Sequence, residues 1–119
     1  MTITAKFTNT HDIADVKLGF MQQSEVGSMD CEGIFDTGAV LVSLPVQIVE
    51  QLGSDIVTHK RVRYANGQVE SKPIAGKHRL EIQGRTAELR CIVQDHAFPV
   101  LIGQIALAEM VWAVHPQRQ

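Results

Sequence analysis

The residues best suited to chemistry in this chain surround Asp36. This carboxylate follows an apolar pair, precedes a turn of small residues, and is succeeded by a second apolar run. The stretch reads Ile34-Phe35-Asp36-Thr37-Gly38-Ala39, followed by Val40–Leu44. Burying a carboxylate between apolar segments is costly unless hydrogen bonds or a partner compensate the charge. Carboxylates in such surroundings are often functional, so we interpret Asp36 as the chemical centre.

A single carboxylate activates water poorly. Two carboxylates that face each other at about 3 Å share one proton, so one can accept a proton from water while the other donates to a scissile carbonyl. The sequence holds one acid in this setting, and a two-fold dimer would supply the second. There, Thr37 offers a hydroxyl for bonds across the dimer, Gly38 permits close backbone approach and Ala39 leaves room for substrate. Asp-Thr-Gly alone usually means a surface turn, and only the apolar flanks argue against that here.

Short strands separated by turn signals account for most of the chain. A helix is predicted between Pro45 and Gly53, and Asn66-Gly67 predicts a hairpin turn. Gln104–Ala108 could add one or two helical turns. Strands are predicted at Met1–Thr8, Ile13–Met21, Met29–Phe35, Val40–Leu44, Val57–Tyr64, Gln68–Ser71, Pro73–Ile82, Thr86–Val93, Pro99–Gly103 and Met110–Val114. This pattern indicates an all-β, closed or partly open barrel with one or two short helices.

Length and composition exclude several classes of protein. The 119 residues predict one domain over residues 1–119, with 45% hydrophobic and 20% charged residues. A net charge of -2 offers no basic field for nucleic acid or an anionic membrane. No apolar run reaches the roughly 18 residues of a membrane span, and we see no signal peptide. We therefore expect a cytoplasmic protein with Cys31 and Cys91 reduced, a disulfide being the minor alternative.

Three blocks of sequence resemble the retropepsin-like aspartic proteases, the single-domain homodimeric relatives of pepsin, and the small bacterial members in particular. The first block is Ile34–Ala39 with Val42–Pro45, and the second is Tyr64-Ala65-Asn66-Gly67, where the family carries its flap hairpin. The third is Val100–Gly103 with Leu107, similar to the family's apolar-apolar-Gly motif and its short helix. The likeness spans about residues 30 to 110 and implies the acid protease fold.

The resemblance also implies roles for individual residues, without a metal or cofactor. Asp36 would be the catalytic acid, one per protomer, Thr37 would bond across the dimer and Gly38 would line the substrate floor. The flap would consist of Tyr64, Ala65, Asn66 and Gly67. The pocket lining and its support would be Ile34, Val42, Ala65, Val100, Ile102 and Gly103, the last two packing against the active-site loop.

Two departures from the family concern the dimer. Viral members carry an acid soon after Asp-Thr-Gly-Ala and a basic residue just after the second glycine. The corresponding places here look like Val40 or Leu41 and Gln104, so both halves of that ion pair are absent. The terminal strands that viral members use for dimerisation are not recognisable by motif. Met1–Thr8 and Met110–Val114 are candidates by position and apolarity only.

Other polar residues have simpler interpretations. The five histidines, His11, His59, His78, His96 and His115, are scattered without metal-ligand spacing, so we expect no metal site. The basic run Lys60–Arg63 near the expected flap could favour acidic substrates. A solvated strand face whose charges prevent edge-to-edge aggregation is the favoured interpretation.

Two functions from different classes fit these observations. The first is a homodimeric aspartic endopeptidase that cleaves extended, mostly apolar segments of a peptide or protein substrate between two Asp36 carboxylates. The second is a catalytically inactive dimeric peptide-binding or assembly module on the same fold. The intact Asp-Thr-Gly favours the enzyme, because a binding module need not keep a costly paired carboxylate.

Overall fold

The computed structural model describes residues 2–36 and 38–114, with side chains described up to Met110. The strands are β1 (Thr2–Asn9), β2 (Ser28–Phe35), β3 (Val42–Pro45), β4 (Ile56–Arg63), β5 (Val69–Ile82), β6 (Arg85–Gln94) and β7 (Val100–Ile102). The helices are α1 (Thr10–Lys17), α2 (Val46–Leu52) and α3 (Gln104–Val114), with a 3-10 turn, η1 (Gln23–Glu25). The predicted barrel class is confirmed, with three α-helices instead of one or two.

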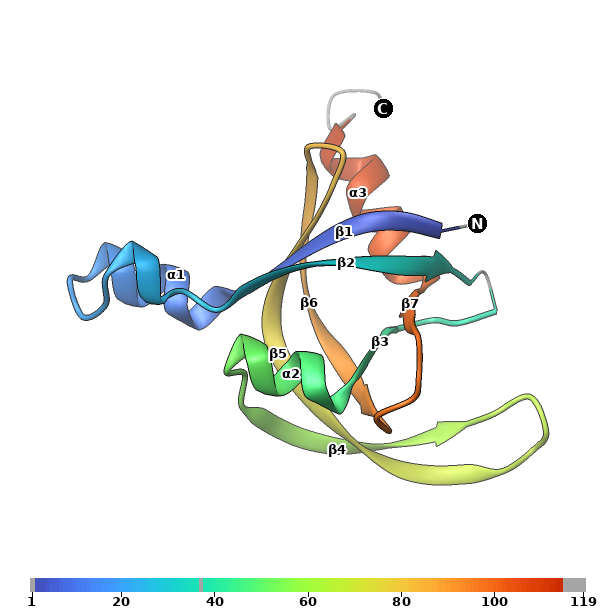
Figure 1. Ribbon diagram of the computed structural model, residues 1–119. Coiled ribbons are helices and arrows are strands. Elements are labelled where there is room, and N and C mark those ends of the chain that lie inside the picture. Colours follow the sequence, from blue (N-terminus) through green and yellow to red (C-terminus); the bar gives the residue numbers. More distant parts are fainter. Residues whose placement is uncertain (1, 37, 115–119) are drawn as a thin grey trace.

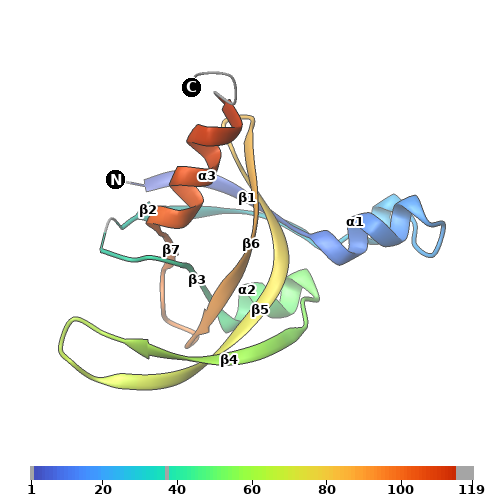
Figure 2. The same ribbon diagram turned by 180° about the vertical axis from the view of Figure 1, so that it is seen from behind.

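The sheet closes on itself into a six-stranded barrel (Figure 1, Figure 2). Its strand order is β1-β2-β7-β3-β6-β5-β4, and β1 also pairs with β5. β1 pairs with β2 along Thr2 to Thr8 on one edge and with β5 along Lys6 to Asn9 on the other, so Lys6 to Thr8 have both neighbours. β4 stays outside the closed ring and pairs with β5 alone among the described strands. β4 is therefore the edge strand of the sheet.

Apolar side chains from alternate strand positions fill the barrel. Ala5 and Phe7 of β1 are fully buried, and Leu44, Leu80 and Ile102 from three other strands join them. This period of two is the one expected for strands with one face toward a core. In the part of the chain that the structure describes, no helix combines the length and apolarity needed to span a membrane.

The predicted strand at Ile13–Met21 is wrong, because this segment forms α1 and the turn after it. The side chain of Asn9 caps the helix, its Oδ1 accepting hydrogen bonds from the N–H groups of His11 at 3.0 Å and Asp12 at 3.3 Å. Leu18 and Phe20, which carried the alternating pattern, are 67% and 80% exposed. The helix projects away from the barrel in Figure 1. The N-terminal cap therefore favours a helix, and the alternating apolar residues of this segment have no core to pack against.

The predicted strand at Met110–Val114 is also wrong, since these residues form the second half of α3. Ala106 and Met110, four residues apart and therefore on one helix face, are buried. Six of the eleven residues of α3 are alanine, leucine, glutamate or methionine, which are strong helix formers. One of the two candidate dimerisation strands is consequently absent from the described residues.

Other predicted boundaries agree closely with the structure. α2 covers Val46–Leu52 and ends at Gly53, whose φ of 66° places it in the left-handed region that favours glycine. The segments Gln68–Ser71 and Pro73–Ile82 form one continuous strand, β5, because Pro73 keeps its place in the register opposite His59 of β4.

Candidate active site

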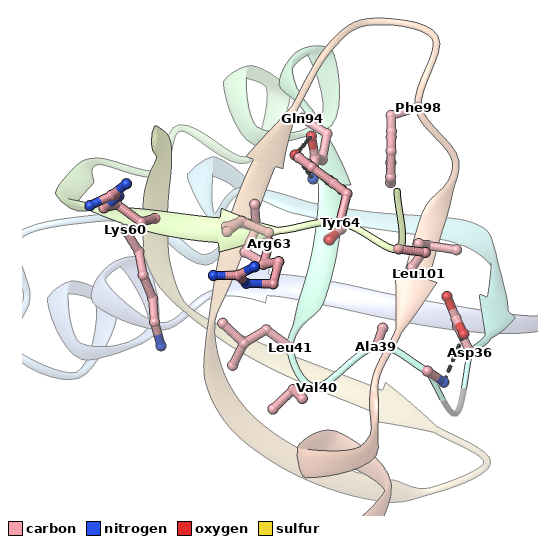
Figure 3. A pocket seen from close by; sticks show the side chains of 16 residues that line it. Asp36, Ala39, Val40, Leu41, Lys60, Arg63, Tyr64, Gln94, Phe98 and Leu101 are labelled. Atoms are coloured by element: carbon pink, nitrogen blue, oxygen red, sulfur yellow. Dashed lines mark hydrogen bonds between the residues drawn. The ribbon is translucent and has the colours of Figure 1, made fainter. Parts of the chain in front are cut away.

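Asp36 lies at the end of β2, at the start of the loop that leads to β3. Its N–H donates to the carbonyl oxygen of Ile102 at 3.2 Å, which continues the parallel pairing that joins Phe35 to Ile102. Its Oδ1 accepts a hydrogen bond from the N–H of Gly38 at 2.9 Å, and its carbonyl oxygen accepts one from the N–H of Ala39 at 3.0 Å. The carboxylate is half-buried, and its own loop fixes its orientation (Figure 3).

The first turn of α3 holds the other side of this loop. The N–H of Gln104 donates to the carbonyl oxygen of Ala39 at 2.9 Å, and that of Ile105 donates to the carbonyl oxygen of Val40 at 3.2 Å. The first N–H groups of a helix lack partners within the helix, and here loop carbonyls supply them. Gly103 permits this approach, because a Cβ there would lie 2.7 Å from the carbonyl carbon and oxygen of Val40.

A pocket of about 650 Å³ opens between the Asp36 loop and the β4–β5 hairpin. This volume lies in the range typical of ligand sites. Asp36 supplies the one carboxylate among the described residues that line it. The lining residues are Asp36, Gly38, Ala39, Val40, Leu41, Ser43, Lys60, Arg61, Val62, Arg63, Tyr64, Ala65, Ile92, Gln94, Phe98 and Leu101.

The hairpin turn opposite Asp36 is defined by its own hydrogen bonds. The N–H of Gly67 donates to the carbonyl oxygen of Tyr64 at 2.9 Å, and the N–H of Tyr64 donates to the carbonyl oxygen of Gln68 at 2.9 Å. Gly67 has a φ of 86°, whereas Asn66 does not adopt a positive φ. The turn is therefore of the longer kind closed by a left-handed glycine, not a two-residue Asn-Gly turn.

The expected flap residues divide between the pocket and the turn. Tyr64 and Ala65 line the pocket, while Asn66 and Gly67 form the turn beyond the lining residues. The hydroxyl of Tyr64 lies 3.4 Å from Oε1 of Gln94, a side chain that also lines the pocket (Figure 3). This contact connects the start of the hairpin turn to the end of β6.

Most of the expected pocket lining lies elsewhere. Val42, Val100 and Ile102 are buried in the core beneath the Asp36 loop, so they support it without facing the pocket. Ile34 is 37% exposed and does not line the pocket either. Ala65 is the member of the expected lining that the structure places there, and Thr37 lies outside the described residues.

Leu101 and Phe98 are pocket residues that the sequence reasoning missed. A signal for Leu101 was available, because Val100 and Ile102 are its neighbours on β7 and alternate strand residues point to opposite faces. Once those two are assigned to the core, Leu101 must face away from it. Phe98 lies in the loop before β7, where no periodic pattern operates.

A second group of polar residues forms on α1, where helical spacing brings together side chains that looked scattered in the sequence. The possible ligand atoms of His11, Asp12 and Asp15 all lie within 4.8 Å of one another. His11 Nδ1 lies 3.3 Å from Asp15 Oδ2, and Asp12 Oδ2 accepts a hydrogen bond from the N–H of Gly27 at 2.8 Å. These contacts give the three side chains a structural role in the segment that runs from α1 to Gly27.

Comparisons with known proteins give similarity in structure only. Searches of known protein families and of curated proteins find no match to this sequence. The chain is similar in structure to the simian foamy virus (mac) protease, with a TM-score of 0.57 and 11% identity, over 96% of each chain. It is also similar to the EIAV protease complexed with the inhibitor HBY-793, with a TM-score of 0.53 and 16% identity, over 69% of this chain and 78% of that one. The chain therefore has the retropepsin-like fold of the aspartic proteases.

Proposed function

We propose that this chain is an aspartic endopeptidase that works as a homodimer and cleaves peptide bonds between two Asp36 carboxylates. The observation that carries the proposal is the position of Asp36 in this fold. The carboxylate lines a pocket opposite a hairpin, in a loop held by hydrogen bonds to β7 and α3. Preorganised groups of this kind lower the cost of reaching a transition state.

The need for a second chain follows from the pocket. Asp36 is the one carboxylate among its described lining residues, and water activation between two acids requires another. Exposed apolar residues lie near Asp36 in the sequence and at its loop. Val40 is 58% exposed, and Ile105, whose N–H donates to the carbonyl oxygen of Val40, is 43% exposed. Ile34, two residues before Asp36, is 37% exposed. Exposed apolar surface of this kind is typical of an interaction site. A two-fold axis beside this surface would bring the two Asp36 residues together.

The proposed reaction uses water as the nucleophile. Two adjacent carboxylates cannot both ionise, so they hold one proton between them. The ionised one removes a proton from water as it attacks the scissile carbonyl, and the protonated one donates to the carbonyl oxygen. The hairpin that carries Tyr64 and Ala65 would cover the bound peptide and exclude bulk water. The apparent pKa values of this reaction belong to the pair and not to either residue.

Replacing Asp36 tests the chemistry. We expect Asp36→Asn to keep the fold and the dimer and to reduce peptide cleavage by roughly a thousandfold or more, because an amide can neither accept nor donate the catalytic proton. Cleavage of a mixed peptide library followed by mass spectrometry gives the rate, and circular dichroism and sedimentation check the fold and assembly. Cleavage at the wild-type rate would exclude Asp36 as the catalytic acid.

Mixing wild-type protein with the Asp36→Asn variant tests the dimer through activity. If each active site needs one Asp36 from each of two chains, an about ninefold excess of the variant should reduce the activity of the wild-type protein to about a tenth. Heterodimers then hold a single carboxylate and are inactive. Activity that does not change on mixing would mean that each chain acts alone.

The alternative is a catalytically inactive peptide-binding module on the same fold. The observation in its favour is α3, which occupies the place of an expected dimerisation strand at Met110–Val114. Sedimentation near pH 5 and pH 7, with and without a statine-type inhibitor, separates the two functions. A dimer tightened by the inhibitor supports the protease, whereas a monomer that binds peptides without releasing products supports the module.

We also propose a cytoplasmic location, supported by the state of the two cysteines. Cys31 and Cys91 are free thiols. Burial, and secondarily the charge of Asp30, raises the pKa of Cys31 to about 11, and burial also raises the pKa of Cys91. Both thiols are therefore protonated and unreactive near neutral pH, as suits residues that pack in a reduced state.

A further inference from the structure

Three cationic side chains line one wall of the pocket. Lys60, Arg61 and Arg63 come from β4, a strand without any aspartate or glutamate. Asp36 is the one anionic group among the described lining residues, and Figure 3 shows it across the pocket from Lys60 and Arg63. The whole chain has a net charge of -2, so this positive wall is a local feature and not a reflection of overall composition.

These three cations have no partners among the described residues. Among the acids of neighbouring segments, Glu70 and Asp95 both pair with Lys72, whose Nζ lies 3.7 Å from Glu70 Oε2 and 3.8 Å from Asp95 Oδ1. Glu88 and Glu109 line a second pocket together with Lys60, and Glu88 pairs with Arg79. The side chains of Lys60, Arg61 and Arg63 take part in no ion pair or hydrogen bond within the part of the chain that the structure describes, although their backbone belongs to the β4–β5 pairing. An unpaired positive wall favours an anionic occupant.

We propose that Lys60, Arg61 and Arg63 form a subsite that selects peptide substrates carrying an aspartate or glutamate side chain. This inference rests on the proposed peptidase function and names its substrate class. Guanidinium groups suit carboxylates because they can donate two parallel hydrogen bonds. The acidic residue of the substrate must lie some residues away from the scissile bond, since a carboxylate next to the Asp36 pair would be repelled.

The same charges also have a purely structural interpretation. β4 is the edge strand of the sheet, and charged side chains on edge strands prevent pairing with other chains. That role predicts a change in solubility when the charges are removed and no change in the choice between substrates. Substrate discrimination therefore distinguishes the two interpretations, and total activity does not.

The experiment compares matched peptides about ten residues long, with an apolar centre and amidated C-termini, that differ only by glutamate or glutamine at one position. We expect the wild-type protein to prefer the best glutamate peptide in kcat/KM by roughly three- to tenfold at low salt, as one or two exposed charge pairs allow. The triple variant Lys60→Gln/Arg61→Gln/Arg63→Gln should lose this preference. Arg85→Gln, in the β5–β6 hairpin outside the pocket, removes one charge as a control and should retain it.

Two further conditions sharpen the result. Raising the salt to about 0.5 M should reduce the preference, because exposed charges are then screened. The preference should also disappear below about pH 4, where the glutamate of the peptide becomes neutral. A wild-type protein that cleaves both peptides equally, or a triple variant that keeps the preference, would overturn the subsite.

Binding separates this proposal from the proposed reaction. The Asp36→Asn protein cannot be expected to cleave, but fluorescence anisotropy can measure its affinity for the same labelled peptides. Tighter binding of the glutamate peptide that the three substitutions abolish would support the subsite even if no cleavage occurs under any condition. Equal affinities for both peptides, together with measurable cleavage by the wild-type protein, would refute the subsite but would still support the proposed peptidase function.

Discussion

Gly103 is the residue on which the geometry of the Asp36 loop depends most directly. It precedes α3 and lies against the backbone of Val40 and Leu41, where a Cβ would come within 2.7 Å of three backbone atoms. Backbone atoms cannot rotate away as a flexible side chain can. Any side chain at position 103 must therefore separate the loop from the helix that holds it.

We expect Gly103→Ala to lower the free energy of unfolding by about 1–3 kcal/mol and to reduce the proposed peptidase activity more than this loss of stability would suggest. The larger effect on activity follows because the displaced loop carries Asp36. Urea unfolding and kcat measure the two effects. Gly19→Ala is the control: Gly19 has a φ of 81° with no atom within 4 Å of its missing Cβ, so the change strains the backbone far from the loop. Equal activity in both variants would contradict the assigned role of Gly103.

Among individual residues, the sequence predicts the loop around Asp36 better than it predicts the distant residues that line the pocket. Asp36, Gly38 and Ala39 are placed together because they are consecutive, and chain connectivity brings them to one loop. Phe98 and Leu101 reach the pocket only because β7 pairs with β2 and β3. Such pairing between distant segments depends on the complete sheet and has no local signature.

Among the elements, Asn9 connects the end of β1 with α1 and α2. Its Oδ1 accepts from the first N–H groups of α1, and its Nδ2 donates to the carbonyl oxygens of Leu52 at 3.0 Å and Gly53 at 3.2 Å. The side chain is buried, so these hydrogen bonds are protected from competition with water. One residue thus fixes the beginning of α1 and the end of α2.

We expect Asn9→Ala to lower the free energy of unfolding by about 2–3 kcal/mol, because it removes both the cap and the two bonds to α2. Asn9→Ser should lower it by about 1 kcal/mol less, since a serine hydroxyl can still cap α1. Urea titrations followed by circular dichroism provide the comparison. If both variants had the same stability, the cap would contribute nothing.

The two segments that the sequence mispredicts each have a physical cause of their own. Ile13–Met21 alternates like a strand, but Asn9 caps it as a helix and leaves Leu18 and Phe20 in solvent. Met110–Val114 is apolar enough for either structure, and Met110 is buried on the same face of α3 as Ala106, which favours the helix. The other strands, α2 and the hairpin at Gly67 follow local turn and cap signals, which the sequence does contain.

For the whole molecule, the acidic limit of stability depends on a buried histidine. His78 is fully buried, with its ring edge-on to Phe7 and its Nε2 hydrogen-bonded to the hydroxyl of Ser54. Burial lowers its pKa from 6.5 to about 4. The unfolded chain takes up this proton near pH 6.5 and the folded chain only near pH 4. The contribution of His78 to stability is therefore fully present above pH 6.5 and is lost as the pH falls to about 4.

We expect His78 to contribute a decline on the order of 3 kcal/mol in the free energy of unfolding between pH 6.5 and pH 4. The variant His78→Gln should be less stable at neutral pH but should show a shallower decline over this interval, because its amide does not titrate. Urea unfolding of both proteins at several pH values gives the difference, in which titration of the carboxylates cancels. Parallel curves would assign the acid sensitivity to other groups.

The hydrogen bonds that Asp36 and its loop share with Ile102, Gln104 and Ile105 also set an order of events during protein synthesis. Asp36 is made before these residues, so its loop gains its supports only after residue 105 has left the ribosome. The barrel likewise cannot close until β5 is available to pair with β1. A nascent chain that has not yet made α3 therefore holds Asp36 without the complete support of its loop. If the proposed peptidase is correct, proteolytic activity is delayed until α3 has emerged from the ribosome.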